Sequence, residues 1–331
     1  MNATLVRRAA ERPRTTTMKA AVLAAPGEFR IEEIAVPEPT ASQVLVRLEG
    51  CGVCASNIPR WEGRSWFEYP MSPGALGHEG WGTVAAVGAD VGEFSEGERV
   101  AMISYHAYAE FDLGEIGSLV KLPDKLDDQS FPAEPLGCAM NIFKRSEIKR
   151  GDYVAIIGIG FLGALLSQLA AAAGAHVIAI NRRSYALQFA RAADKLLLDE
   201  HVAGRVKQIT GGRMCNVVIE AVGKQNALDL AGELTCERGR LVIAGYHQDG
   251  LRQINMQLWN WRGLDVINAH ERDPAVYLEG MQRAVAAVES GLLDPAPLYT
   301  HRFPLDQIGE AFRMAGERPD GFMKALMIYD R

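Results

Sequence analysis

The sequence has no apolar run of the roughly 20 residues that a helix needs to cross a bilayer. Its most apolar segment, the Ala- and Leu-rich stretch after Gly163, is interrupted by Ser167, Gln168 and Gly174. A dense basic run is also absent, and the formal net charge is −6. We therefore expect a soluble protein whose partners are small molecules, with no membrane or nucleic-acid contacts.

Cysteine is scarce, with five residues among 331. An odd and small number of cysteines in a long chain is not typical of a disulfide framework, and it predicts a reducing compartment, the cytoplasm. Residues 1–17 carry four arginines but lack the apolar core of a secretory signal. We expect a disordered N-terminal extension there; a transit peptide and a start codon placed upstream of the true one are the alternatives.

The chain is long enough for two domains, and a hydrophobic content of 48% can fill a large core. Residues 18–137 contain short β-like runs separated by Gly, Pro and acidic turns, which predicts a β-rich domain. The clearest of these runs are Ala20–Leu23, Gln43–Leu48, Gly82–Val87 and Arg99–Ile103.

From residue 138 to residue 270, apolar strands alternate with helical segments, a pattern that predicts an α/β fold with a doubly wound parallel sheet. The expected strands are Val154–Ile157, Val177–Ile180, Lys195–Leu198, Val217–Glu220, Leu241–Ala244 and Leu264–Asn268. Residues 271–331 begin with a helical stretch to about Ser290 and end in an apolar run at Phe322–Tyr329. We expect this last segment to return to the first domain.

A glycine motif lies where the first of these strands ends. The run Val154–Ile157 is followed by a GxGxxG pattern, then by an Ala/Leu-rich helix and a second strand at His176–Ile180. In this context the backbone can approach a pyrophosphate, and the helix N-terminus can face its negative charge. We expect a dinucleotide to contact Gly158, Gly160, Phe161, Leu162 and Gly163; a tight turn in an unrelated α/β protein is the alternative.

The end of the second strand predicts which dinucleotide binds. NAD-preferring sites place an acid about 20 residues beyond the glycines, where it holds the ribose 2′-hydroxyl. Here the position is Asn181, and Arg182 and Arg183 follow as guanidinium donors that suit a phosphate. This predicts a preference for NADP(H); the alternative is a pair of solvated arginines beside an Asn181 that binds a bare ribose.

Three groups in the β-rich part offer metal ligands: CGVCASN, GHEGWG and EPLGC. A catalytic zinc uses three protein ligands and leaves one position open, and Cys54, His78 and Glu134 would supply them. Taken singly, each residue is more often a buried cysteine or a satisfied polar group. Cys51 and Cys54 also form a C-x-x-C, but the sequence has no second C-x-x-C to complete a four-cysteine site.

The order of these groups gives the chain a resemblance to the medium-chain dehydrogenase/reductase family, and in particular to its zinc-dependent alcohol and polyol dehydrogenases, over residues 18–331. The matching motifs are GVCASN, GALGHEGWGTVAAVG, AYAEF, LVKLPD, EPLGC, GDYVAIIGIGFLG, NVVIEAVG, GRLVIAGY and HRFPLDQIGEAF. The resemblance implies a GroES-like catalytic domain at 18–137, a Rossmann coenzyme domain at 138–270, and an active site between them.

The family's metal ligands map onto this sequence residue by residue. Cys54 and His78 match the first two zinc ligands, and Glu134 matches the third ligand of the polyol branch. Cys138, four residues further on, is the alternative third ligand. Glu79 matches an acid beside the histidine ligand that can exchange with water at the metal; a buried structural carboxylate is the alternative for it.

The sequence departs from the family at the proton relay. Ser56 matches the hydroxyl that accepts the substrate proton. The aspartate that steadies the histidine ligand is replaced by Asn57, whose side-chain carbonyl can still accept a hydrogen bond from His78. The histidine that ends the relay is replaced by Pro59, so the proton must pass to the ribose, to water or to another side chain.

The resemblance also implies the metal count, a coenzyme contact and the assembly. The segment between Arg99 and Lys121 contains no cysteine, so the structural-zinc lobe of many relatives is absent and one Zn²⁺ per chain is expected. Lys324 lies near the position where relatives place a basic residue on the pyrophosphate. Family members are homodimers or homotetramers.

The resulting hypothesis is reversible oxidation of a secondary alcohol or polyol to a ketone, with zinc as Lewis acid and NADP(H) as hydride carrier. A zinc-free quinone or enone reductase of the same fold is the first alternative, and a non-catalytic NADPH-binding protein is the second. The metal-ligand residues separate the hypothesis from both. The sequence does not identify the substrate.

Overall fold

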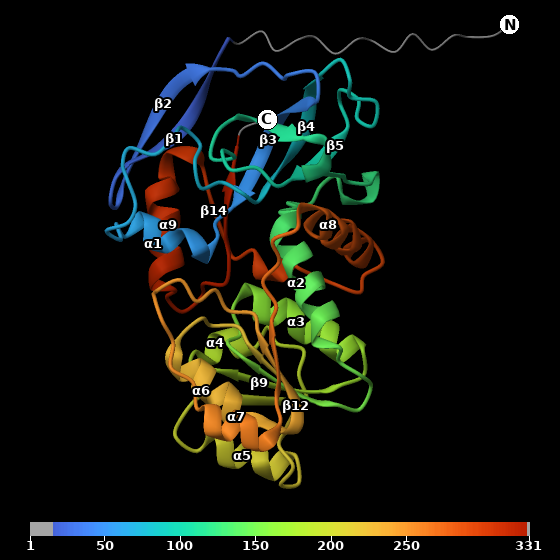
Figure 1. Cartoon of the computed structure of the whole chain (residues 1–331). Helices are drawn as coiled ribbons and strands as arrows, with labels where there is room; N and C mark the ends of the chain where they lie inside the picture. Colours follow the sequence, from blue (N-terminus) through green and yellow to red (C-terminus); the bar gives the residue numbers. More distant parts are fainter. Residues whose placement is uncertain (1–15, 330–331) are drawn as a thin grey trace, which may run out of the picture. The chain divides into compact units, whose positions relative to one another are not determined.

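The computed structural model describes residues 16–329, and these form two compact units (Figure 1). The first unit contains the described residues up to Pro132, Phe303–Phe312, and the chain from Leu326 onward. The second contains Ala133–Arg302 and Arg313–Ala325. Most of the predicted extension, residues 1–15, lies outside the described residues.

The first unit is built on antiparallel strands. Strands β1 and β2 form one ribbon, and a larger sheet has the order β14-β15-β3-β4-β5-β7, with β6 also paired to β3. The strand bounds are β1 Thr17–Ala25, β2 Glu28–Ala35, β3 Gln43–Gly52, β4 Gly80–Val87, β5 Arg99–Met102, β6 Phe111–Glu115, β7 Leu119–Lys121, β14 His301–Phe303 and β15 Ala325–Ile328. The helices of this unit are short: η1 Ala55–Asn57, α1 Ile58–Trp61, η2 Ile116–Ser118, η3 Asp124–Leu126, η5 Leu305–Gln307 and α9 Ile308–Glu317, which runs on beyond it.

The end of the final apolar run, from Leu326 onward, lies in this unit, whereas Phe322–Ala325 lies in the second unit. Strand β15 pairs antiparallel with β3, and Met327 lies opposite Cys51. At Gly50 an added Cβ would overlap the Met327 carbonyl oxygen and the indole of the buried Trp81. A glycine is therefore required for the close approach of β15 and β3 beside Trp81.

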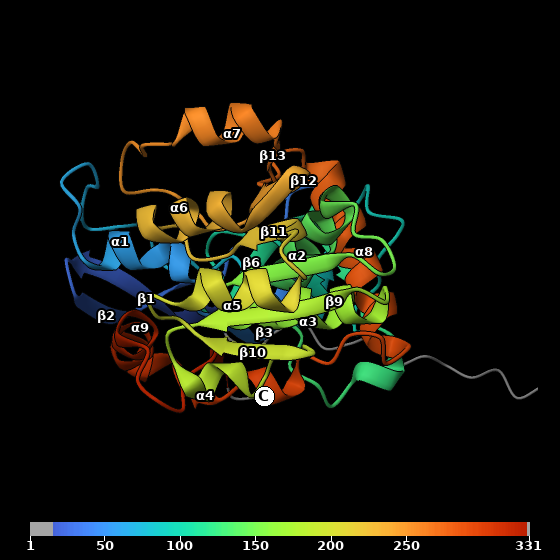
Figure 2. The same cartoon turned by 90° about the horizontal axis from the view of Figure 1, so that it is seen from below.

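The second unit contains a six-stranded sheet with the order β10-β9-β8-β11-β12-β13, whose pairs are all parallel (Figure 2). The strands are β8 Tyr153–Ile157, β9 His176–Asn181, β10 Asp194–Leu197, β11 Cys215–Glu220, β12 Thr235–Ile243 and β13 Asp265–Asn268. Strands β9 and β10 follow on one side of β8, and β12 and β13 follow on the opposite side, beyond β11. The α/β prediction, with a β-rich first part and a doubly wound second part, is confirmed.

Helices cover both faces of the parallel sheet (Figure 1). One face packs on α5, α6 and α7 through a core that includes Ile157, Val206, Leu228 and Trp259. The helices of this unit are α2 Ala133–Ser146, α3 Phe161–Ala172, α4 Ser184–Leu187, α5 Val202–Ile209, α6 Gln225–Leu234, α7 Met256–Arg262, α8 Pro274–Glu289 and η4 Ala296–Leu298. No helix within residues 16–329 is long and apolar enough to cross a membrane.

Candidate active site

The first part of the site lies in the turn that follows β3. Cys54 has an extended backbone (φ −90°, ψ 138°) and directly precedes the short helix η1. That helix turns the chain back, so Ser56 Oγ lies 3.1 Å from Cys54 Sγ and donates a hydrogen bond to it. The serine hydroxyl therefore lies directly beside the Cys54 sulfur.

The orientation of His78 is set by a backbone carbonyl. His78 Nδ1 lies 3.0 Å from the Leu76 carbonyl oxygen, and a carbonyl can only accept. Nδ1 therefore carries the proton, and Nε2 is the ring nitrogen that would bind a metal. Leu76 has a positive φ of 76°, a conformation rare for a branched residue, and this strain directs its carbonyl toward the histidine.

Asn57 does not take the role that the sequence suggested. Its Nδ2 donates to the same Leu76 carbonyl oxygen over 2.8 Å. The Leu76 carbonyl thus supplies the acceptor for His78 that the sequence analysis had assigned to the Asn57 side chain. Sequence patterns could not identify Leu76, because a backbone acceptor leaves no signature in residue type.

Glu79 completes a cluster with these residues. It is fully buried, and one ligand atom each from Cys54, His78 and Glu79 lies within 4.8 Å of the others. An added Cβ at position 52 would overlap the Glu79 carboxylate, so the glycine there provides the space that this carboxylate occupies. Thiolate, imidazole and carboxylate are zinc's preferred donors, and this cluster therefore fits that ion.

Glu134 and Cys138 lie in the second unit, in the first part of α2. Cys138 Sγ donates a hydrogen bond to Glu134 Oε1 over 3.2 Å, so one helix face presents both side chains. Glu134 also lies in the first turn of the helix, where the positive end of the helix dipole favours a carboxylate. Their roles as metal ligands stay predictions.

The glycine motif forms the turn between β8 and α3. Gly158 has a φ of +96°, and an added Cβ at Gly163 would overlap the Gly158 carbonyl oxygen. At Gly160, by contrast, an added Cβ would meet nothing within 4 Å. Gly160 is also the N-cap of α3 and has no side-chain cap, so the first N–H groups of the helix are available to an anion.

Substitution of these glycines is expected to separate folding from coenzyme binding. Gly163→Ala should destabilise the protein by about 2 kcal/mol because its Cβ overlaps backbone. Gly160→Ala should leave stability almost unchanged but weaken NADPH binding about tenfold, because its Cβ would fill the space that a pyrophosphate needs. Chemical denaturation and NADPH fluorescence titration would measure the two effects. Equal NADPH affinity for Gly160→Ala and wild type would contradict a pyrophosphate at this turn.

Lys324 lies beside the same helix end. It is 6% exposed, and its Nζ is 5.1 Å from the ring centroid of Phe161, the first residue of α3. Phe161 in turn stacks on Tyr299, with ring centroids 5.7 Å apart. The ammonium of Lys324 and the N-terminus of α3 together place positive potential at one point, which suits a pyrophosphate.

At the end of β9, Asn181 and Arg183 are held by other parts of the protein, whereas Arg182 is exposed. Asn181 is tied to the protein, because its Oδ1 accepts from Ile159 N (3.1 Å) and its Nδ2 donates to Arg183 O (3.1 Å). Arg183 Nη1 donates to carbonyl oxygens of the segment 318–322, at 2.8 Å for Phe322, and burial lowers the pKa of its guanidinium. Arg182 is exposed. Of the two arginines, Arg183 therefore has a structural role and Arg182 is the more accessible to a ligand.

Comparisons with known families agree with this geometry. Residues 40–117 match the family described as alcohol dehydrogenase GroES-like domain, and residues 162–286 match the family described as zinc-binding dehydrogenase. The first segment contains Cys54, His78 and Glu79, and the second contains most of the parallel-sheet unit.

Individual relatives cover nearly the whole chain. The chain is 29% identical to sorbitol dehydrogenase of Bombyx mori, over 89% of this chain and 94% of that protein. It is 26% identical to D-arabitol-phosphate dehydrogenase of Enterococcus avium, with coverage of 89% and 94%. A solved structure from Sinorhizobium meliloti 1021, assigned as a zinc-binding dehydrogenase and bound to NADP, superimposes with a TM-score of 0.80 at 26% identity, covering 95% of this chain and 100% of that one.

The predicted family is thereby confirmed from three directions: the two domain matches, the full-length relatives and the parallel-sheet fold. The cluster of Cys54, His78 and Glu79 adds the donor set that the family's zinc needs. This chain belongs to the zinc-binding medium-chain dehydrogenases, oxidoreductases that act on CH–OH groups with a nicotinamide coenzyme.

Proposed function

We propose that this protein oxidises a secondary alcohol of a polyol or sugar-like substrate to the ketone, reversibly, and that it prefers NADP(H) over NAD(H). The observation that carries the chemistry is the convergence of Cys54, His78 and Glu79 ligand atoms within 4.8 Å. The substrate class is supported by relatives that are named for sorbitol and D-arabitol phosphate.

Cys54, His78 and Glu134 would hold the zinc, with Glu79 as an additional carboxylate beside the histidine. When bound, zinc supplies a Lewis acid that polarises the substrate oxygen, and the nicotinamide accepts the hydride. The Leu76 carbonyl accepts from Nδ1, so Nε2 is the nitrogen of His78 that would bind the zinc. Of the three proposed ligands, the Cys54 thiolate and the Glu134 carboxylate would balance the charge of Zn²⁺, and the His78 imidazole would be a neutral donor.

Ser56 is the proposed proton acceptor of the substrate hydroxyl. Its Oγ currently donates to Cys54 Sγ, so the hydroxyl lies next to a proposed metal ligand. A serine hydroxyl can accept one proton only if it passes its own onward at the same time. Since Pro59 is buried and has no side-chain donor, that proton must leave toward water, the ribose or another side chain.

The coenzyme is proposed to lie across Gly158, Gly160, Phe161, Leu162 and Gly163, with Lys324 on the pyrophosphate. Arg182 would bind the 2′-phosphate, and Arg183 supports the segment 318–322 that precedes Lys324. The side chain of Asn181 leaves the site without the carboxylate that would repel a phosphate.

A coupled activity and metal measurement tests this function. We expect NADP⁺ reduction with at least one polyol, sugar or secondary alcohol, about one zinc per chain by inductively coupled plasma analysis, and loss of activity on complete chelation that added zinc restores. Turnover that survives complete zinc removal would overturn the mechanism and favour the zinc-free quinone or enone reductase. Two zinc ions per chain would refute the single-metal proposal.

We also propose that the protein is a cytoplasmic homodimer or homotetramer. None of the five cysteines, all of which lie within residues 16–329, forms a disulfide, which suits a reducing compartment. Strand β13 forms one end of the parallel sheet and is largely exposed, and the nearby Trp261 is 87% exposed. An edge strand with exposed apolar neighbours is typical of a surface that pairs with another copy. Light scattering should give two or four times the chain mass of 36.1 kDa.

A further inference from the structure

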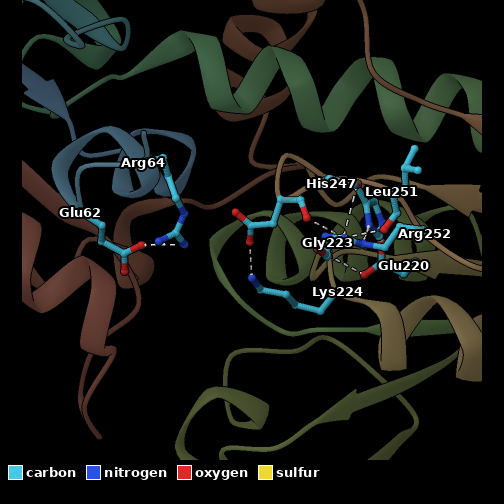
Figure 3. A network of polar contacts seen from close by, with 10 residues as sticks. Glu62, Arg64, Glu220, Gly223, Lys224, His247, Leu251 and Arg252 are labelled. Carbon is cyan, nitrogen blue, oxygen red and sulfur yellow. Dashed lines mark hydrogen bonds and ion pairs between the residues drawn. The ribbon is translucent and has the colours of Figure 1, made fainter. Parts of the chain in front are cut away.

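A buried glutamate organises the turn that follows β11. Glu220 is the last residue of this strand and is fully buried (Figure 3). Its Oε1 accepts from the backbone N–H groups of Val222 (2.8 Å) and Gly223 (2.7 Å). One carboxylate oxygen therefore fixes two consecutive peptide groups of the turn.

The other carboxylate oxygen faces His247, from the loop after β12. Glu220 Oε2 and His247 Nε2 are 2.9 Å apart, and the histidine side chain is 15% exposed. His247 Nδ1 lies 3.0 Å from Arg252 Nε, which can only donate. Nδ1 is therefore the acceptor and Nε2 carries the proton. The histidine thus donates to Glu220 through Nε2 and accepts from Arg252 through Nδ1.

The guanidinium of Arg252 binds backbone carbonyl groups of the loop after β12. Its Nη1 donates to the carbonyl oxygens of Asp249, Gly250 and Leu251 at 3.2–3.4 Å. Its Nη2 donates to the carbonyl oxygen of Gly223 over 3.2 Å. The arginine thus binds the turn after β11 to the loop after β12 a second time, independently of Glu220 (Figure 3).

These two segments lie directly against the glycine motif. An added Cβ at Gly158 would be 2.5 Å from Val222 Cγ2 and 3.1 Å from the Ala221 carbonyl oxygen. At Gly223 it would lie 2.7 Å from the Tyr246 carbonyl oxygen. The ends of β8, β11 and β12 are therefore packed backbone against backbone, and displacement of one turn moves its neighbours.

The position of this cluster in the sheet links it to the coenzyme. Strands β8 and β11 are neighbours from which the sheet is built in opposite directions. Ligands of doubly wound sheets bind at this switch point, outside the carboxyl ends of the strands. Val222, 37% exposed although apolar, lies at this end of β11.

We propose that Glu220, His247 and Arg252 form a positioning relay that shapes the coenzyme crevice from the side of β11 and β12. This inference rests on the proposed NADP(H) binding, but it assigns roles to three residues outside the glycine motif and the metal cluster. The relay holds residues 221–223 in the geometry that the coenzyme meets, so its loss weakens coenzyme binding more than it slows the reaction at saturating coenzyme.

The hydrogen-bond directions make Glu220→Gln informative. The amide oxygen of a glutamine can still accept from Val222 and Gly223, but its NH₂ then faces the N–H of His247. If the histidine changes tautomer to avoid this, its Nδ1–H faces the Arg252 Nε–H instead. Either arrangement contains two opposed donors, so the relay breaks although the residue size is unchanged.

The test compares His247→Phe, Glu220→Gln and Arg252→Met with wild type, using the full-length zinc-loaded protein. NADPH affinity is measured by fluorescence titration, kcat is measured at saturating coenzyme, and Tm monitors folding. We expect the affinity for NADPH to fall about tenfold in each variant, as for loss of a buried charge-assisted hydrogen bond, with kcat within about threefold of wild type. His247→Gln keeps a donor for Glu220 and should restore part of the affinity.

Lys224→Gln is the matched control. Lys224 pairs with Asp249 in the same region over 2.6 Å, but the lysine is 59% exposed and binds the Asp249 carboxylate, not the Asp249 carbonyl oxygen that Arg252 binds. Its loss should change NADPH affinity less than twofold. Should a substitution at Glu220 or Arg252 prevent folding, His247→Phe and His247→Gln decide the question.

Three results would overturn the relay: variants that bind NADPH as tightly as wild type, variants that lower Tm without a change in affinity, and a Lys224→Gln effect as large as that of His247→Phe. Failure of the proposed function would look different, because wild type itself would then bind neither NADPH nor NADH.

Discussion

Replacing Cys54 by alanine is expected to remove the bound zinc and to lower kcat/KM by at least about 10³-fold. The thiolate is the strongest zinc donor of the proposed set, and its loss leaves an imidazole and carboxylates that bind zinc weakly. The hydrogen bond from Ser56 Oγ to Cys54 Sγ also disappears, so the proton acceptor loses its orientation. Zinc content and steady-state kinetics on the purified protein measure both effects.

Cys236→Ala provides the control for this experiment. Cys236 is also a free, partly buried cysteine, but it lies in β12, and its thiol contacts only the backbone of Glu237 among the hydrogen bonds found for it. Activity and zinc content should stay within about twofold of wild type. A Cys54→Ala protein that retains one zinc and full activity would exclude Cys54 as a ligand.

The third ligand is decided by a second pair of variants. Glu134 and Cys138 share a helix face and a hydrogen bond, so either could meet a metal. We propose Glu134, and Glu134→Ala should lose zinc while Cys138→Ser keeps it. The reverse outcome would assign the metal to the thiolate of Cys138.

The double substitution Asn181→Asp with Arg182→Ala is expected to change the NADP-to-NAD ratio of kcat/KM by about 10³-fold in favour of NAD. Loss of an arginine–phosphate contact accounts for about 2 kcal/mol, and repulsion between a carboxylate and the 2′-phosphate for a similar amount. Together these reach about 4 kcal/mol, or roughly three factors of ten. Steady-state kinetics with both coenzymes measures the ratio.

The structure determines which arginine to change. Arg183 is bound to the carbonyl oxygens of residues 318–322, so its substitution would disturb the segment leading to Lys324 and confuse binding with folding. An aspartate at position 181 can still accept from Ile159 N–H, as Asn181 does. Arg182→Lys, which keeps the charge but not the planar fork, should give an intermediate ratio. A wild-type preference for NAD would contradict the proposed coenzyme selectivity.

The sequence alone determined the α/β architecture and the glycine turn between β8 and α3. Strands buried on both faces must be continuous apolar runs, as Val154–Ile157 is, and each of the six predicted strands is present. Glycines are visible in sequence because backbone geometry demands them: Gly163 meets the backbone of Gly158 too closely for any side chain. A structural feature can be predicted from sequence when its local geometry permits only one kind of residue, such as a glycine at a close backbone contact or an apolar residue in a buried strand.

Other elements escaped sequence analysis because their local patterns are ambiguous. Strand β2 was not predicted, since its residues are mostly exposed and its short alternation at Phe29 and Ile31 ends at Glu32–Glu33. The apolar run at Phe322–Tyr329 is a strand only over Ala325–Ile328, because Met323 N–H donates to Thr300 and the Phe322 carbonyl accepts from Arg183 instead of pairing with a neighbouring strand.

Only the tertiary structure decided how the site residues are held. The bond from the Asn57 side chain to the Leu76 carbonyl, and the bond between Glu220 and His247, join residues from separate segments. Such bonds depend on the register of neighbouring strands and on the path of their loops, and neither is encoded within any one segment. The sequence therefore identified the donors, the glycines and the family, whereas the fold selected which backbone groups and loops hold them in place.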